Sequence, residues 1–165
     1  MIIKELSSKS QDIIIVTSSL TQDMNNSKLD SVYKASAIRA LGTIVDGSMV
    51  QSIERFIKTA MADRNGLMSS AALVTGIHLF EVNKEAVRRW LSDVQQALSL
   101  APQKSITQYH ALGLAYLVKQ NDRMAIMKLV QQMQSSAANP LSACLFLRMY
   151  VSVLSKDPSI KYSTI

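Results

Sequence analysis

The sequence predicts an all-α protein built from a repeating pair of helices. The 165 residues contain only three prolines and five glycines, so few positions break a helix. Apolar residues recur at helical spacing along nearly the whole chain, and no segment alternates apolar and polar residues as a half-buried strand does. A similar apolar helix also returns at intervals of about 35 residues, which indicates an internal repeat.

Turn residues divide the chain into predicted helices. Asn25-Asn26-Ser27, Asp46-Gly47-Ser48, Asn65-Gly66 and Asn121-Asp122 have the side chains that favour turns and helix caps. Pro102 and Pro140 lie where helices are expected to begin. The predicted helices are a short one at 1–7 and longer ones at 11–24, 31–45, 48–63, 67–81, 84–99, 105–119, 122–135 and 141–155.

Two kinds of helix alternate along the chain. Residues 49–63 and 84–98 each place apolar side chains on one arc and charged ones on the other, so one face of each helix is expected to meet solvent. Residues 67–80 and 106–118 are apolar almost all round, which predicts that neighbours cover them on several sides. Amphipathic helices are therefore expected to lie outside the apolar ones.

The apolar helices align with one another on an alanine. The segments 35–44, 70–79, 109–118 and 141–150 superpose on Ala37, Ala72, Ala111 and Ala143, with separations of 35, 39 and 32 residues. A helix pair that recurs at about this interval is the signature of an α-solenoid of antiparallel helix pairs, of HEAT or armadillo type. A compact helical bundle is the alternative interpretation.

Composition limits the function without choosing one. The longest aliphatic run, residues 13–16, is far shorter than the ~20 residues that span a bilayer. The single cysteine, Cys144, rules out an internal disulfide framework and favours a reducing, cytoplasmic compartment. The net charge of +6 favours acidic partners, but the cations are scattered and form no basic run.

The candidate catalytic residues all have a structural interpretation. His78 and His110 lie in apolar helices without a facing acid, so each is expected to be a core or interhelical histidine with a satisfied hydrogen bond. Cys144 lies in an apolar context and is expected to be buried. One cysteine and two distant histidines make no metal-ligand cluster, and no glycine-rich phosphate loop is present. No catalytic residue, metal or cofactor is therefore predicted.

A basic strip is the candidate binding surface. Arg55, Lys58, Arg88 and Arg89 lie on the solvent faces of two successive outer helices, and outer faces of successive repeats form one extended surface. These cations would suit an acidic partner. Ordinary solvated charge is the alternative, because Glu54, Glu85 and Asp93 lie among them.

Four stretches carry a resemblance to a known family. They are DIIIVTSSLTQDM (12–24), KASAIRALGTIVDGSMVQSIERFIKTAMADR (34–64), AVRRW (86–90) and QYHALGLAYLVKQNDRMA (108–125). Together they resemble the N-terminal trunk of coatomer gamma subunits of COPI coats, which belong to the adaptin-like large-chain family. The final residues, from Ser155, depart from that pattern.

The resemblance implies a non-enzymatic scaffold in a COPI vesicle coat. It implies contacts with a zeta-like small chain, a beta-like large chain and an Arf-type small GTPase in its GTP form, with cargo-receptor tails as further partners. It implies a cytoplasmic protein, peripheral on Golgi membranes and COPI vesicles, acting in Golgi-to-ER and intra-Golgi transport. Residues 1–165 are then expected to be one segment of a longer trunk.

Two other functions are left open by the residues alone. The net charge of +6 is compatible with a helical-repeat module that binds nucleic acid, although no Arg, Gln or aromatic set recurs at fixed repeat positions. A hydrolase that uses His110 is the third class, and it would need an orienting partner for that histidine.

Overall fold

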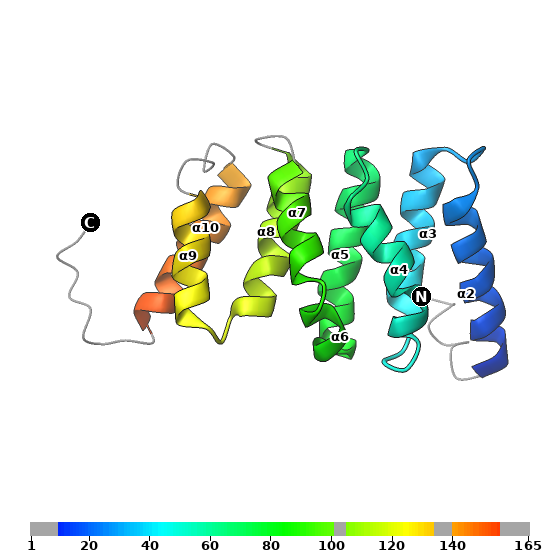
Figure 1. Ribbon diagram of the computed structural model, residues 1–165, viewed down its shortest axis with the longest axis horizontal. Helices are drawn as coiled ribbons and strands as arrows, with labels where there is room; N and C mark the ends of the chain where they lie inside the picture. The colour runs from blue at the N-terminus through cyan, green and yellow to red at the C-terminus, as the bar shows by residue number, and fades with distance from the viewer. Residues whose placement is uncertain (1–9, 101–104, 134–139, 156–165) are drawn as a thin grey trace.

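A computed structural model describes residues 10–100, 105–133 and 140–155 (Figure 1). All regular structure in these ranges is helical. The helices are α2 (Ser10–Asn25), α3 (Ser31–Ile44), α4 (Val50–Met61), α5 (Gly66–Val82), α6 (Lys84–Arg88), α7 (Leu91–Leu100), α8 (Ile106–Lys119), α9 (Arg123–Met133) and α10 (Pro140–Ser155). The helix predicted at 1–7, the helix start at Pro102 and residues 134–135 lie outside the described residues.

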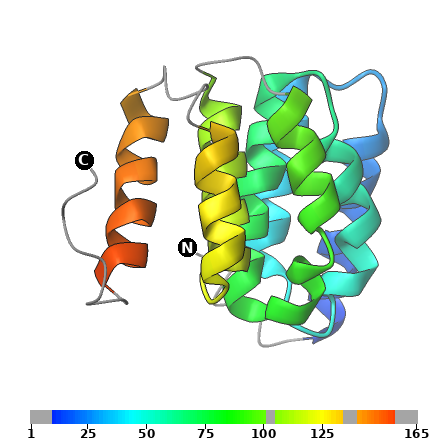
Figure 2. The same cartoon turned by 60° about the vertical axis from the view of Figure 1, so that its left-hand side comes forward.

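The helices form two layers that extend along one direction. In one layer α3, α5, α8 and α10 lie side by side, and each packs on the next (Figure 1). The other layer contains α2, α4, α7 and α9, and α4 packs on α5 while α7 packs on α8 (Figure 2). Because packing follows chain order, the described helices form a solenoid, which confirms the predicted fold over the compact bundle.

The layer of α3, α5, α8 and α10 matches the four segments that align on alanine. Ala37, Ala72 and Ala111 are all buried. Closer approach occurs at two glycines: a Cβ at Gly42 would lie 2.7 Å from Thr75 Cγ2, and a Cβ at Gly76 would lie 2.7 Å from Leu114 Cδ2. Small residues therefore allow α5 to approach α3 on one side and α8 on the other.

The amphipathic character predicted for residues 49–63 is confirmed in α4. Val50, Ile53 and Ile57 are fully buried beneath the helix, while Gln51 and Arg55 are exposed on its outer side. One face of α4 therefore covers the α3 and α5 layer, and the other faces solvent.

The single helix predicted at 84–99 is wrong, because the chain breaks between α6 and α7. The backbone N–H of Arg89 donates to the Ala86 carbonyl at 3.2 Å, and that of Trp90 donates to the Val87 carbonyl at 3.0 Å. These three-residue hydrogen bonds close a tight turn in place of another α-helical turn. The indole of Trp90 is fully buried at this break, which anchors the turn in the core.

Several polar contacts join residues about one repeat apart. Thr75 Oγ1 donates to the Ile38 carbonyl at 3.1 Å, across 37 residues of sequence. Thr107 Oγ1 donates to the Gly66 carbonyl at 3.2 Å, across 41 residues. Because the first of these hydrogen bonds is buried, it helps to set the register between α3 and α5.

Candidate interaction surface

The turn that precedes α4 is held together by Asp46. The carboxylate of Asp46 accepts hydrogen bonds from the Ser48 hydroxyl at 2.7 Å and from the backbone N–H groups of Ser48 and Met49, both at 3.0 Å. The Ser48 hydroxyl, helped by the Met49 N–H, holds the pKa of Asp46 below its usual value. This turn immediately precedes α4, whose charged face carries the residues described next.

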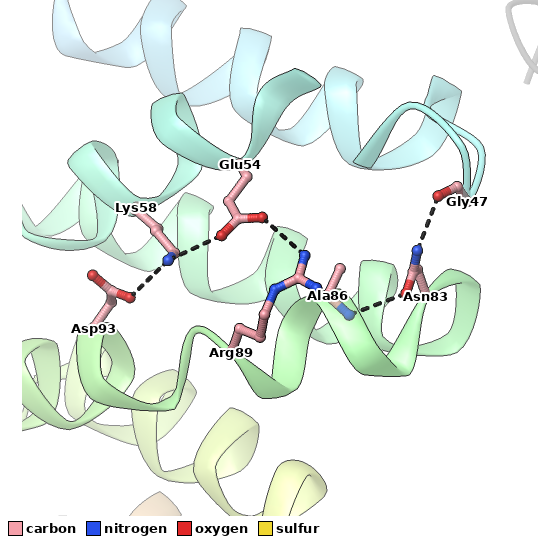
Figure 3. A network of polar contacts seen from close by, with 7 residues as sticks. All are labelled: Gly47, Glu54, Lys58, Asn83, Ala86, Arg89 and Asp93. Atoms are coloured by element: carbon pink, nitrogen blue, oxygen red, sulfur yellow. Dashed lines mark hydrogen bonds and ion pairs between the residues drawn. The ribbon is translucent and has the colours of Figure 1, made fainter. Parts of the chain in front are cut away.

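Glu54 is the centre of an ion-pair network between neighbouring repeats (Figure 3). Its carboxylate contacts Lys58 Nζ at 3.0 Å, one turn along α4, and Arg89 Nη2 at 3.4 Å, in the turn after α6. Lys58 Nζ also contacts Asp93 Oδ2 at 3.5 Å, in α7. The network therefore links α4 to the turn after α6 and to α7 at the surface of the solenoid.

This geometry shifts the pKa values of the two central groups in opposite directions. Partial burial raises the pKa of Glu54, but the hydrogen bonds and charges of Lys58 and Arg89 outweigh it, so the net pKa is lowered. The hydrogen bond that the Lys58 ammonium donates to Glu54 is the main cause that raises the pKa of Lys58, and burial opposes it. Both shifts favour the charged pair at neutral pH, although the side chains, 21% and 30% exposed, are partly screened by solvent.

Asn83 supports the same region from the other end of α6. Its side-chain oxygen accepts from the Ala86 backbone N–H at 3.0 Å, which caps α6, and its Nδ2 donates to the Gly47 carbonyl at 3.0 Å (Figure 3). One side chain therefore starts α6 and ties it to the turn before α4. Sequence reasoning missed this residue, although an asparagine before Lys-Glu-Ala is a recognisable N-cap signal.

The four residues of the predicted basic strip differ in their surroundings. Lys58 and Arg89 belong to the network, and Arg88 pairs with Glu85 one turn before it. Arg55 has no ion pair among the described residues and lies at the rim of an open groove. The structure therefore places an unpaired cation beside three paired ones.

From the sequence alone, Glu54 is only one of the interleaved acids that favour ordinary solvated charge, and its central position in the network was missed. The signal that would have found it is the repeat interval: Glu54 and Arg89 are 35 residues apart, the same separation as Ala37 and Ala72. Residues at one repeat interval lie at equivalent places in adjacent units, so opposite charges at that interval come together.

The predictions for the histidines have different outcomes. His110 is half-buried, and its Nδ1 is joined to Ser70 Oγ by a 2.8 Å hydrogen bond between α8 and α5, which confirms an interhelical role. Burial, joined by the charge of Arg39, lowers the pKa of His110. His78 is exposed, so the buried position predicted for it is wrong. In a two-layer solenoid one face of α5 remains open, and His78 lies on that face.

The burial predicted for Cys144 is also wrong, because its side chain is exposed. Cys144 shares a face of α10 with Leu147 and Val151, which are 62% and 61% exposed. The opposite side of α10 packs on α8 and α9, so no described helix covers this face.

Metal-ligand clusters and membrane-spanning helices are both absent from the residues that the structure describes. Among residues 10–100, 105–133 and 140–155, no three His, Cys, Asp or Glu side chains gather as a metal-ligand set. None of the described helices is long and apolar enough to span a bilayer. The features that stand out on the described surface are the ion-pair network and the groove beside Arg55.

The two-layer array of helix pairs, tied together at the repeat interval, defines the chain as a helical-repeat solenoid. Comparison with known proteins then identifies the family. The sequence model of the protein family called adaptin N-terminal region matches residues 1–164, and the chain belongs to this family.

Relatives in the same family are named coatomer gamma subunits. The chain is 47% identical to coatomer subunit gamma of Arabidopsis thaliana over 158 residues. This aligned region covers 95% of the chain and 17% of the relative. It is 46% identical over 156 residues to the probable coatomer subunit gamma of Caenorhabditis elegans (94% and 18%). It is also 40% identical over 156 residues to coatomer subunit gamma of Drosophila melanogaster, and this region covers 94% of the chain and 17% of the relative. The chain thus spans less than a fifth of the length of these relatives.

Proposed function

We propose that this chain acts as a non-enzymatic scaffold segment of a COPI-type vesicle coat subunit. The observation that carries the proposal is the 40–47% identity to coatomer gamma subunits, which extends over at least 94% of the chain. The coat would act in transport from Golgi to endoplasmic reticulum and within the Golgi. The protein would be cytoplasmic and peripheral on the Golgi membrane.

The solenoid supports a role in which the protein acts by binding partners on its surface rather than by catalysis. Two layers bury one continuous core, while the outer helices and the connections present an extended face to partners. The partners we propose are a zeta-like small chain, a beta-like large chain, an Arf-type small GTPase in its GTP form, and cargo-receptor tails.

Within this segment we propose the outer face of α4 and α6 as the partner surface, with Arg55, Lys58, Arg88 and Arg89 as its cations. Arg88 and Arg89 keep 43% and 55% of their side chains exposed despite their ion pairs, so their remaining N–H donors are accessible. Arg55 adds a charge that no described acid compensates.

Retention of the GTPase on the immobilised chain tests this assignment. We expect more retention of an Arf-type GTPase loaded with GTP than with GDP, and weaker retention by Arg88→Glu. Arg148→Glu is the matched control, because Arg148 is also an exposed arginine and lies on the distant helix α10. Equal retention of both nucleotide forms by the folded chain would exclude a nucleotide-dependent GTPase site from this segment.

A nucleic-acid-binding module is the second candidate, and the net charge of +6 is the observation that favours it. Affinity for single-stranded RNA, measured against salt concentration, separates the two functions. A nucleic-acid module binds at low salt and weakens steeply as salt rises, since binding releases counterions. A coat scaffold is expected to show no binding even at low salt.

A further inference from the structure

An open groove lies at one edge of the solenoid, beside α4. The ends of α2 and α4 lie next to the beginnings of α3 and α5 there. These four helices line a groove with a volume of about 620 Å³. This volume is within the ~300–1,000 Å³ range of ligand-binding sites in proteins. The groove is therefore large enough to hold several side chains of a partner.

The inner part of the groove is apolar. Met24, Ala60 and Met68 come from three different helices and are buried, with 9%, 4% and 6% of their surfaces exposed. Phe56 and Leu29 are half-buried and line the same space. An apolar side chain that enters this space would move from water onto a surface of methionine and aromatic groups, which is favourable. The methionine side chains are flexible and can adapt to different shapes.

The rim of the groove carries an excess of positive charge. Lys34 on α3 and Arg55 on α4 line it, and neither forms an ion pair among the described residues. Asp63 is the acid on the rim, and its carboxylate already accepts the backbone N–H of Asn65 at 2.7 Å. Since every other cation of the predicted strip has an acidic partner, the unpaired charge of the strip is concentrated at this groove.

We propose that this groove binds an acidic linear peptide, with carboxylates on Lys34 and Arg55 and one large apolar side chain on the floor. An open groove leaves much of a small molecule in water, whereas an extended peptide can cross the rim and insert only its anchor. The side-chain amide of Asn25 lies on the rim, where it can bond to the peptide backbone, and Asn65, whose side-chain oxygen caps α5, can still donate from its Nδ2. This inference goes beyond the proposed coat function and does not depend on it.

Selection from a displayed library of random short peptides tests the proposal on the 165-residue chain. The peptides that are enriched should contain two or more acidic residues next to a leucine, methionine or phenylalanine. A synthetic copy of an enriched peptide is then measured by fluorescence anisotropy. Its affinity should fall as salt rises, because exposed ion pairs are screened. No enrichment, or enrichment of sequences without acidic residues, would overturn the proposal.

Variants of the groove locate the binding. Arg55→Glu and Lys34→Glu should each weaken the peptide about 5- to 10-fold. Thr59→Trp should weaken it at least as much without a change of charge, because Thr59 is exposed on the groove wall and a larger side chain there fills the space.

Arg148→Glu and Lys128→Glu are the matched charge controls, both exposed on the distant helices α10 and α9. They should leave the affinity unchanged. An equal loss in the controls would mean attraction to net charge alone, and unchanged binding by the groove variants would place the peptide elsewhere. Either result overturns the groove assignment. Retention of GTPase is a separate measurement, so failure of one proposal does not imply failure of the other.

Discussion

Replacing Gly42 by alanine tests the close approach of α3 and α5. A Cβ at this position would lie 2.7 Å from Thr75 Cγ2 and 3.3 Å from Thr75 Cβ, so Thr75 would have to move. Thr75 has little freedom to do so, because it is buried, β-branched and hydrogen-bonded to the Ile38 carbonyl at 3.1 Å. We therefore expect the substitution to destabilise the chain.

The magnitude follows from two opposing terms. Overpacking a rigid site costs about 1–3 kcal/mol. Alanine in a helix is better than glycine by about 0.5–1 kcal/mol, which offsets part of that cost. The net expectation is a loss of about 1 kcal/mol, within a range of about 0–2.5 kcal/mol, and each 1 kcal/mol corresponds to a Tm lower by about 2–4 °C for a chain of this size.

A double-mutant cycle with Thr75→Ser isolates the contact. Serine keeps the hydroxyl that donates to Ile38 but removes Cγ2, the atom that alanine at residue 42 would meet. In the Thr75→Ser background Gly42→Ala should therefore become neutral or stabilising, with a coupling free energy of about 1–3 kcal/mol. Urea unfolding followed by circular dichroism measures all four members of the cycle.

Gly76→Ala is the comparison for the same helix layer. A Cβ at Gly76 would meet Leu114 Cδ2 at 2.7 Å and Met61 Cε at 3.2 Å, which are the ends of flexible side chains that can rotate away. We expect a net change smaller than that of Gly42→Ala. A Gly42→Ala protein that is more stable than the parent, or a cost that Thr75→Ser leaves unchanged, would refute the reasoning.

Three further predictions concern the polar contacts. Glu54→Gln should cost about 0.5–1 kcal/mol in urea unfolding. Because the folded pKa of Glu54 lies below its ordinary value of 4.5, the ion-pair contribution is present above that pH and is lost as the pH falls through the folded value, a dependence that the variant should lack. Asn83→Ala should lower the free energy of unfolding by about 1–2 kcal/mol and speed hydrogen exchange at the Ala86 amide, whereas unchanged exchange would contradict the cap. Burial lowers the pKa of His110 below 6.5, so the parent should lose stability as the pH falls below 6.5, and His110→Gln should remove that loss.

Helix positions were predictable because their signals are local. The spacing of apolar residues and the turn residues placed α3, α5 and α8 within a few residues of where they lie, and Pro140 begins α10 as expected. The break between α6 and α7 was missed, since no proline or glycine marks it. Trp90 is fully buried at that turn, and its burial depends on neighbouring helices that the local sequence does not reveal.

Burial was predicted less well where it depends on which neighbours are present. His78 and Cys144 lie in apolar sequence surroundings, and both are exposed. Helical periodicity indicates how many faces of a helix are apolar, but the number of helices that cover it is a property of the packed array. For α5 one face remains open, and for α10 no described helix covers the side of Cys144.

The sequence by itself determined the class of fold, the repeat interval and the resemblance to the adaptin family, because all three are expressed in patterns along the chain. Only the tertiary structure decided which charges are paired. Glu54 and Asp93 neutralise Lys58 and Arg89 across a repeat, and Arg55 is left at the rim of a groove. Whether a cation is compensated depends on distances of a few ångströms between segments 35 residues apart, and those distances are set by packing alone.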